Sequence, residues 1–163
     1  MKISYKWGSH LVALTKVIPI TTGDVLEMGT GLYSTPYLHW ACFGKRKLVS
    51  YDNNPTYIKY AMPFSNNEHQ VIFVEKWEDA NIEKEWDVAL IDNEPSYIRK
   101  EEIKRLSSYS KYIIVHDTED RNLKDYMFDE IYPLFKYRYD FSQVRPQTTV
   151  LSNFTSLENL WSK

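Results

Sequence analysis

Short apolar runs alternate along the chain with longer segments whose apolar residues recur at helical spacing. The short runs predict strands, because a strand that is buried on both faces reads as a brief continuous apolar stretch. The expected strands cover residues 24–29, 47–52, 70–75, 86–92, 111–117, 137–144 and 148–154. The segments between them predict helices over residues 9–20, 34–44, 54–64, 96–109 and 121–135.

This alternation favours an α/β fold. Strands that alternate with helices form parallel pairs, since each crossover packs a helix against a face of the sheet. Five such units are followed by two strands, joined by a turn that contains Pro146. We therefore expect a seven-stranded, mostly parallel sheet with helices on both faces and a C-terminal antiparallel hairpin. A chain of 163 residues, 43% of them hydrophobic, suits one core, so residues 1–163 are expected to form a single domain.

Hydroxyl side chains stand at the expected starts of two helices. Ser9 precedes the first helix, and Ser34 and Thr35 precede the second. Side-chain oxygens at such positions accept hydrogen bonds from the free amides of the first helical turn. We therefore expect Ser9 to cap the first helix, and Ser34 or Thr35 to cap the second.

The charge balance and the single cysteine limit the class of protein. A formal net charge of −2 and a pI near 6.1 give no field for non-specific binding to nucleic-acid backbones. Cys42 is the only cysteine and cannot form an internal disulfide, which is typical of a reducing compartment. The N-terminus lacks the apolar segment of a secretion signal, and no apolar run approaches the roughly 20 residues of a membrane span. We expect a soluble, cytoplasmic protein without membrane contact.

Two of the five glycines, Gly29 and Gly31, follow the first expected strand in the stretch VLEMGTGLYST. A phosphate-binding loop would need a lysine that this stretch lacks. A dinucleotide-binding turn would match both glycines and the later Asp52, but Ser34 stands where its third glycine is expected. Glu27 would repel a pyrophosphate and attract a ligand that carries a sulfonium and an ammonium group. S-adenosylmethionine (SAM) carries both groups.

Five short motifs resemble, in order, those of the class I SAM-dependent methyltransferases. LEMGTG is similar to the first motif of this family, VSYDNNP is similar to the second, and VEKWEDA occupies the place where the family surrounds adenine. DVALIDNEPSYIRKEEI resembles the fourth motif of small O-methyltransferase-like members, and YIIVHDTED resembles the end of their fifth strand. The resemblance covers residues 24–120. It implies a Rossmann-like fold, SAM as the cofactor and methyl transfer as the reaction.

The resemblance also implies which residues bind the cofactor. The backbone of Gly29 and Gly31, with Glu27 beneath it, would hold the methionine end of SAM. Asp52 would bind the ribose hydroxyls, with Asn53 beside it.

The adenine position and the fourth motif depart from the family pattern, and the fourth motif also lacks the histidine that could serve as a base in relatives. Trp77 stands where relatives often have an acidic residue that meets adenine, so it would stack on the ring and leave the polar contact to Glu78 or Asp79. Asp92 would face the sulfonium and the acceptor. Glu94 replaces the first proline of the motif found in methyltransferases that act on amino groups of nucleobases or glutamine.

Three residues at the ends of the fourth and fifth strands are the catalytic candidates: His116, Asp92 and Asp117. His116 is the best general base, because the usual pKa of histidine lies nearest to neutral pH. Alternatively it anchors the turn after the fifth strand. Asp92 and Asp117 could also hold a divalent cation through oxygen ligands, although our expected site contains no metal. As a further alternative, Asp117 caps the following helix.

The remaining histidines show no zinc-binding pattern, and the longest charged run is expected to be structural. His10, His39 and His69 are isolated, with no cysteine or histidine at zinc-binding spacing. The run RKEEIKR is expected to be a solvated helix face with pairs such as Glu101–Arg105.

Three functions remain open at this stage. The first is SAM-dependent methyl transfer to a small-molecule acceptor, with a hydroxyl preferred. The second is a SAM-binding subunit that is non-catalytic or that needs a partner or a second copy. Nearly all residues belong to the seven-stranded scaffold, which leaves no sizeable insertion to form an acceptor pocket. The third is an NAD-dependent oxidoreductase, because Gly29, Gly31 and Asp52 would also suit a nicotinamide dinucleotide.

Overall fold

The computed structural model of the chain describes residues 4–119 and 127–161. Its centre is a seven-stranded sheet in the order β3-β2-β1-β4-β5-β7-β6. The strands are β1 (Val25–Met28), β2 (Leu48–Asp52), β3 (His69–Phe73), β4 (Trp86–Ile91), β5 (Ser110–His116), β6 (Tyr137–Phe141) and β7 (Thr148–Ser152). Neighbouring strands from β3 to β5 are parallel, whereas β7 runs antiparallel to both β5 and β6. The predicted mostly parallel sheet with a C-terminal hairpin is confirmed.

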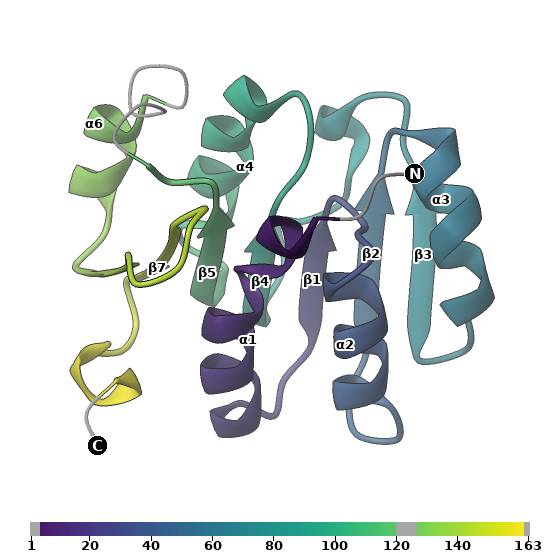
Figure 1. Cartoon of the computed structure of the whole chain (residues 1–163), viewed down its shortest axis with the longest axis horizontal. Coiled ribbons are helices and arrows are strands. Elements are labelled where there is room, and N and C mark those ends of the chain that lie inside the picture. Colours follow the sequence, from purple (N-terminus) through teal and green to yellow (C-terminus); the bar gives the residue numbers. More distant parts are fainter. Residues whose placement is uncertain (1–3, 120–126, 162–163) are drawn as a thin grey trace.

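Helices cover both faces of the sheet (Figure 1). The α-helices are α1 (Leu11–Val17), α2 (Ser34–Cys42), α3 (Pro55–Ala61), α4 (Arg99–Leu106) and α6 (Phe128–Ile131). Short 3-10 helices are η1 (Tyr5–Gly8), η2 (Ile18–Ile20), η3 (Met62–Phe64), η4 (Trp77–Asp79), η5 (Ser96–Ile98), η7 (Tyr132–Leu134) and η8 (Glu158–Leu160). Of the helix predicted over residues 121–135, α6 and η7 form the second part, and the first part lies outside the described residues.

Two apolar layers hold the sheet between the helices. Val25 of β1 packs in the layer with α1 and α2, whereas Leu26 and Met28 pack in the layer with α4 and α6. Successive side chains of a strand point to opposite faces, which explains this division. Glu27 therefore lies on the face of the sheet that α2 covers.

Both predicted helix caps are wrong. The cap position of α1 is His10, with no side-chain capping bond, and the hydroxyl of Ser9 contacts His116 instead. The cap position of α2 is Tyr33, and Thr35 lies inside the helix and donates to Glu27. In each case a buried side chain outside the helix takes up the hydroxyl, in place of an amide of the first helical turn.

The sheet order reverses between β1 and β4, and Gly29 lies at this point. Open α/β sheets bind their ligands at such a reversal, beyond the carboxyl ends of the strands. Gly29 has a φ of 92°, and a Cβ atom there would lie 2.6 Å from the carbonyl oxygen of Asp92. Glycine thus allows the end of β1 to approach the end of β4 closely.

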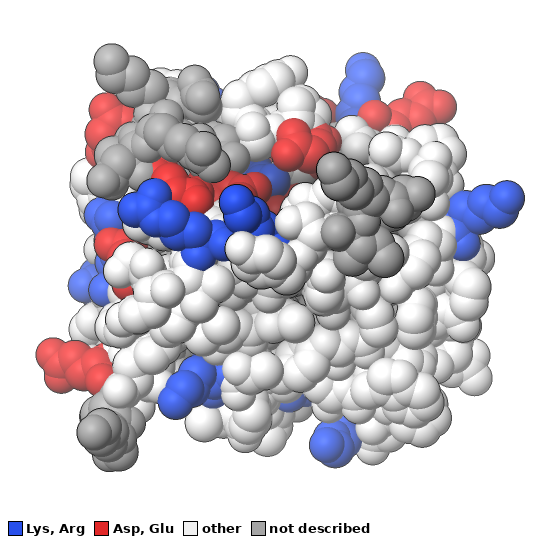
Figure 2. Space-filling view, in the orientation of Figure 1, with Lys and Arg blue, Asp and Glu red and all other residues white. Residues whose placement is uncertain are grey.

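The surface offers few charges over the helices α1 and α2. Figure 2 shows few charged side chains in the lower half of this face, and most of the acidic and basic side chains in its upper half. No helix among the described residues combines the length and the apolar character that a membrane span requires.

Candidate functional site

A cavity of about 300 Å³ opens where β1, β2, β4 and β5 end. Most of the residues predicted for the site line it. They are Gly29, Gly31, Asp52, Asn53, Asp92, His116 and Asp117. Residues from four separate strand ends therefore meet around one space.

Asp52 closes β2 and ties it to the turn after β1. The backbone amide and the hydroxyl of Thr30 donate to its Oδ2 atom, at 2.7 and 3.0 Å. The amide of Asn54 donates to Oδ1 at 2.8 Å. Burial raises the pKa of Asp52, and these hydrogen bonds offset part of the rise. The carboxylate thus orders the rim of the cavity and also faces the cavity.

Glu27 lies beneath the same turn and does not line the cavity. Its carboxylate accepts hydrogen bonds from Thr35 at 2.9 Å and from Ser50 at 2.5 Å. The amide of Gly31 in turn donates to the Thr35 hydroxyl at 2.9 Å. Complete burial raises the pKa of Glu27 to about 7. Glu27 therefore orders an amide of the turn indirectly, through Thr35.

The hydrogen bonds of Glu27 continue to two histidines. Nε2 of His69 lies 2.9 Å from the Ser50 hydroxyl, and Nδ1 of His69 lies 3.1 Å from Nδ1 of His39. The prediction that His39 and His69 are isolated is wrong, because the fold pairs residues that are 30 positions apart. A buried chain of polar groups thus runs from the turn at Gly31 to His39.

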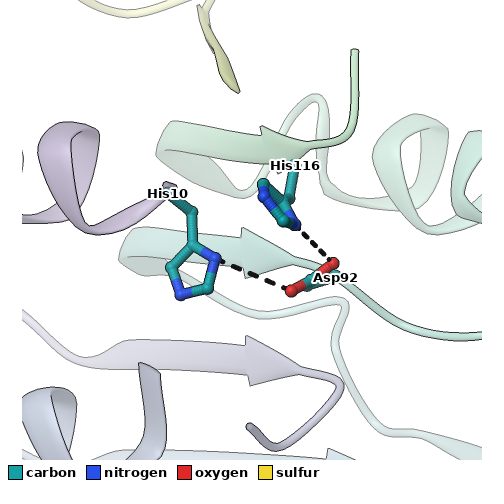
Figure 3. Close-up of side chains that lie close together, drawn as sticks. All are labelled: His10, Asp92 and His116. Carbon is teal, nitrogen blue, oxygen red and sulfur yellow. Dashed lines mark hydrogen bonds and ion pairs between the residues drawn. The ribbon is translucent and has the colours of Figure 1, made fainter. Parts of the chain in front are cut away.

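Asp92, just after β4, has two histidines beside its carboxylate (Figure 3). An arginine, Arg99, also lies near it. Nδ1 of His116 lies 3.0 Å from Oδ1, and the Arg99 guanidinium lies 3.2 Å from the same oxygen. Nδ1 of His10 lies 3.7 Å from Oδ2. Burial alone would raise the pKa of Asp92, but His116 and Arg99 lower it to about 2. The carboxylate is therefore ionised at neutral pH.

Both ring nitrogens of His116 are engaged inside the protein. Nε2 lies 2.8 Å from the Ser9 hydroxyl, and Nδ1 faces Asp92. Burial alone would lower the pKa of His116, but the Asp92 carboxylate raises it. A direct proton transfer to Nε2 would require Ser9 to move away.

Arg99 is fully buried, so the prediction that its charged run is solvated is wrong at this end. Its Nε donates to the carbonyl oxygen of Asn93 at 2.8 Å, and one terminal nitrogen donates to that of His116 at 2.9 Å. The guanidinium also lies 3.7 Å from Asp117. A guanidinium thus lies near both Asp92 and Asp117, which disfavours a divalent cation held between these two carboxylates.

The other end of this charged run also differs from the prediction. Arg105 pairs with Glu83, at 2.5 and 2.9 Å, and not with Glu101. Glu101 instead lies 3.9 Å from Lys104.

Solved structures share this architecture at low sequence identity. An O-methyltransferase from Bacillus cereus in complex with SAH (S-adenosylhomocysteine) has a TM-score of 0.65, with 16% identity over 93% of this chain and 82% of its own. The fold is that of the class I SAM-dependent methyltransferases. Human methyltransferase-like protein 13 in complex with SAH has a TM-score of 0.64, with 12% identity over 96% of this chain and 85% of its own. The N-methyltransferase NodS from Bradyrhizobium japonicum has a TM-score of 0.61, with 10% identity over 90% of this chain and 94% of its own.

Comparisons of sequence give no further relatives. No family model and no curated protein matches the chain.

On this methyltransferase fold, the predicted adenine contacts lie outside the cavity. Trp77 is buried in the apolar layer with α4, and its Nε1 donates to the carbonyl oxygen of Glu94 at 2.8 Å. Glu78 and Asp79 are exposed on η4. None of the three lines the cavity. An indole that packs in the core has no face left for a ligand.

Several residues that line the cavity were not predicted as site residues from the sequence. Aromatic rings of Trp7, Tyr33 and Tyr57 line the cavity, together with His10 and Arg99. Tyr57 lies in the first turn of α3, five positions after Asp52, and this short separation is a usable signal for a shared cavity. No local pattern reveals that Trp7 and His10 line the cavity, because their positions depend on how the N-terminal segment packs against the sheet.

Proposed function

We propose that this protein is a SAM-dependent methyltransferase. The observation that carries the proposal is the single cavity lined by Asp52, by the turn from Gly29 to Gly31 and by Asp92. Asp52 would accept hydrogen bonds from the ribose hydroxyls, with Asn53 beside it, and the backbone of the turn would hold the methionine end. The ionised Asp92 would attract the sulfonium. The SAH complexes of two proteins with this fold support the same cofactor.

Methyl transfer from a sulfonium is an in-line displacement. A lone pair of the acceptor attacks the methyl carbon while the carbon–sulfur bond breaks, and the electron pair of that bond stays on the sulfur of SAH. Much of the catalysis then consists of positioning. A protic acceptor also needs a group that takes its proton. His116 and Asp117, which line the cavity beside Asp92, are the candidates for this role.

The acceptor that we propose is a small molecule with a hydroxyl group. The limited cavity volume and the aromatic side chains of Trp7, Tyr33 and Tyr57 support this class. We also propose a cytoplasmic location, in keeping with the free, buried thiol of Cys42.

Isothermal titration calorimetry with SAM, SAH and NADH tests the cofactor. We expect one SAH per chain and no heat with NADH. Replacing Asp52 by Ala should weaken SAH binding at least ~10-fold, because the ribose hydroxyls lose a charged acceptor. Asp129→Ala, an exposed change on α6, is the control and should bind like the wild type. An absence of SAH binding by the wild type, or tighter binding of NADH, would refute the proposal.

A subunit that needs a partner or a second copy is the second candidate. It is favoured by two exposed rings whose centroids lie 5.7 Å apart, Trp40 on α2 (68% exposed) and Phe43 directly after this helix (52% exposed). Sedimentation together with a methyl-transfer screen over metabolite pools separates the two candidates. A strict monomer that methylates a metabolite unaided would exclude this second function.

A further inference from the structure

His10, Asp92 and His116 bring three potential metal ligands together at one wall of the cavity (Figure 3). His10 directly precedes α1, Asp92 follows β4, and His116 ends β5. One ligand atom from each residue lies within 4.8 Å of the others. The proposed contacts with SAM give His10 no role.

His10 is the unexplained member of this cluster. It is only 2% exposed, and within the described part of the chain neither of its ring nitrogens has a hydrogen-bond partner. Its Nδ1 faces Oδ2 of Asp92 at 3.7 Å, which is too long for a hydrogen bond. Buried polar side chains are nearly always paired, so an unpaired one points to a missing ion, water or ligand.

The spacing of the three groups suits a metal ion. Imidazole and carboxylate ligands lie about 2.0–2.2 Å from Zn²⁺, so two ligand atoms on one ion are roughly 3–4 Å apart. Nδ1 of His10 lies 3.7 Å from Oδ2 of Asp92, and Nδ1 of His116 lies 3.0 Å from Oδ1, so each imidazole has a carboxylate oxygen at this spacing. One ligand atom from each of the three residues lies within 4.8 Å of the others, so a small adjustment would bring all three onto one ion. An ion would replace the hydrogen bond between His116 and Asp92 by two metal bonds and would also engage His10.

Ser9 provides the support that a metal-binding histidine usually has. Its hydroxyl lies 2.8 Å from Nε2 of His116. When Nε2 donates its hydrogen to this hydroxyl, the lone pair of Nδ1 is directed at the cluster. Outer partners of this kind fix the tautomer and the ring orientation of metal-binding histidines.

Arg99 limits which ion the cluster can take. Its guanidinium lies 3.2 Å from Oδ1 of Asp92 and leaves Oδ2 toward His10. One carboxylate beside a guanidinium is a poor site for Mg²⁺ or Ca²⁺, which prefer several oxygen ligands. Two imidazoles instead suit Zn²⁺, Co²⁺, Ni²⁺ or Fe²⁺.

We propose that His10, Asp92 and His116 bind one divalent transition-metal ion at the wall of the cavity. This site differs from the oxygen-ligated site considered for Asp92 and Asp117, because two imidazoles supply the ligands. Metal binding here does not depend on methyl transfer. In a methyltransferase the ion would face the acceptor, where it could bind an acceptor oxygen and favour its deprotonation.

Titration of the chelator-treated, dialysed protein with ZnCl₂, CoCl₂ and MgCl₂ tests the site. We expect one Zn²⁺ or Co²⁺ per chain, a visible Co²⁺ spectrum typical of nitrogen and oxygen ligands, and no Mg²⁺ binding. His10→Asn and His116→Asn should each weaken Zn²⁺ binding by more than ~10-fold. His39→Asn, a change in the other histidine pair, should leave the affinity unchanged.

Ser9→Ala is a second test in case the histidine variants fail to fold, because it keeps all three ligands. We expect it to weaken Zn²⁺ binding about 10-fold through His116 alone, with an unchanged circular dichroism spectrum. Absence of Zn²⁺ and Co²⁺ binding by the wild type would overturn the proposal. So would a loss of binding with His39→Asn but not with His10→Asn. SAH binding, measured separately, shows whether the cofactor proposal fails or stands independently.

Discussion

At the end of β1, Gly29 combines a left-handed φ of 92° with backbone atoms of Asp92 and Asn93 within 2.8 Å of where a Cβ would lie. Gly44 also has a positive φ, 67°, but a Cβ there would meet nothing within 4 Å. Alanine substitutions at the two positions therefore separate the destabilisation caused by the positive φ from that caused by the close backbone contact.

We predict that Gly29→Ala lowers the free energy of unfolding by roughly 2–4 kcal/mol, because both costs apply and the ends of β1 and β4 must separate. Gly44→Ala should cost only about 1 kcal/mol, from the dihedral angle alone. Urea unfolding measures both. Equal losses in the two variants would show that the close approach to Asp92 is not important.

Glu27 gives stability a dependence on pH. Because burial raises its pKa from 4.5 to about 7, the folded state keeps a proton that the unfolded state releases between these values. The contribution of Glu27 to the free energy of unfolding is full below about pH 4.5 and is lost as the pH rises through about 7. The free energy of unfolding then falls by up to ~3 kcal/mol. Glu102, whose pKa burial also raises to about 7, acts in the same direction.

The stability of Glu27→Gln should therefore be less sensitive to pH than that of the wild type, since its side chain stays neutral while Glu102 and the other buried acids still titrate. Thermal unfolding at pH 5 and pH 8 is the measurement. We expect the wild type to lose more stability between the two values than the variant does. Identical losses would mean that Glu27 keeps an ordinary pKa in the folded protein.

At the scale of elements, Arg99 joins the start of α4 to the ends of β4 and β5. Arg99→Met should lower the free energy of unfolding by about 3–5 kcal/mol, because it leaves Asp92 and Asp117 without their guanidinium. Lys104→Met on the same helix removes only exposed pairs, 3.9 Å long, with Glu101 and Glu130, and should cost less than ~1 kcal/mol. Chemical denaturation compares the two, and similar losses would refute a special role for Arg99.

The order of elements could be predicted from the sequence because apolar runs report burial locally. The ends were less accurate: β3 ends at Phe73 and not at residue 75, and α4 starts at Arg99 after the short η5. Partners of polar side chains could not be predicted. For Ser9 and Arg99 the local pattern predicts a helix cap and a solvated helix face, because local propensities carry no information on burial or on partners distant in the sequence.

At the scale of the molecule, the N-terminal segment completes the cavity that the sheet begins. The strand ends carry Asp52 and Asp92, whose positions the motifs indicated, whereas Trp7 and His10 arrive from the segment before α1. Ser9 and His116 are 107 positions apart, yet they share a hydrogen bond. Contacts over such distances follow from tertiary packing, which no local sequence pattern encodes.

A crystal structure of the complex with SAH tests the central claim most directly. Our account predicts the ribose hydroxyls within about 3.2 Å of the Asp52 carboxylate and the methionine end on the backbone between Gly29 and Gly31. SAH bound elsewhere, or bound in this cavity with its ribose away from Asp52, would contradict the account.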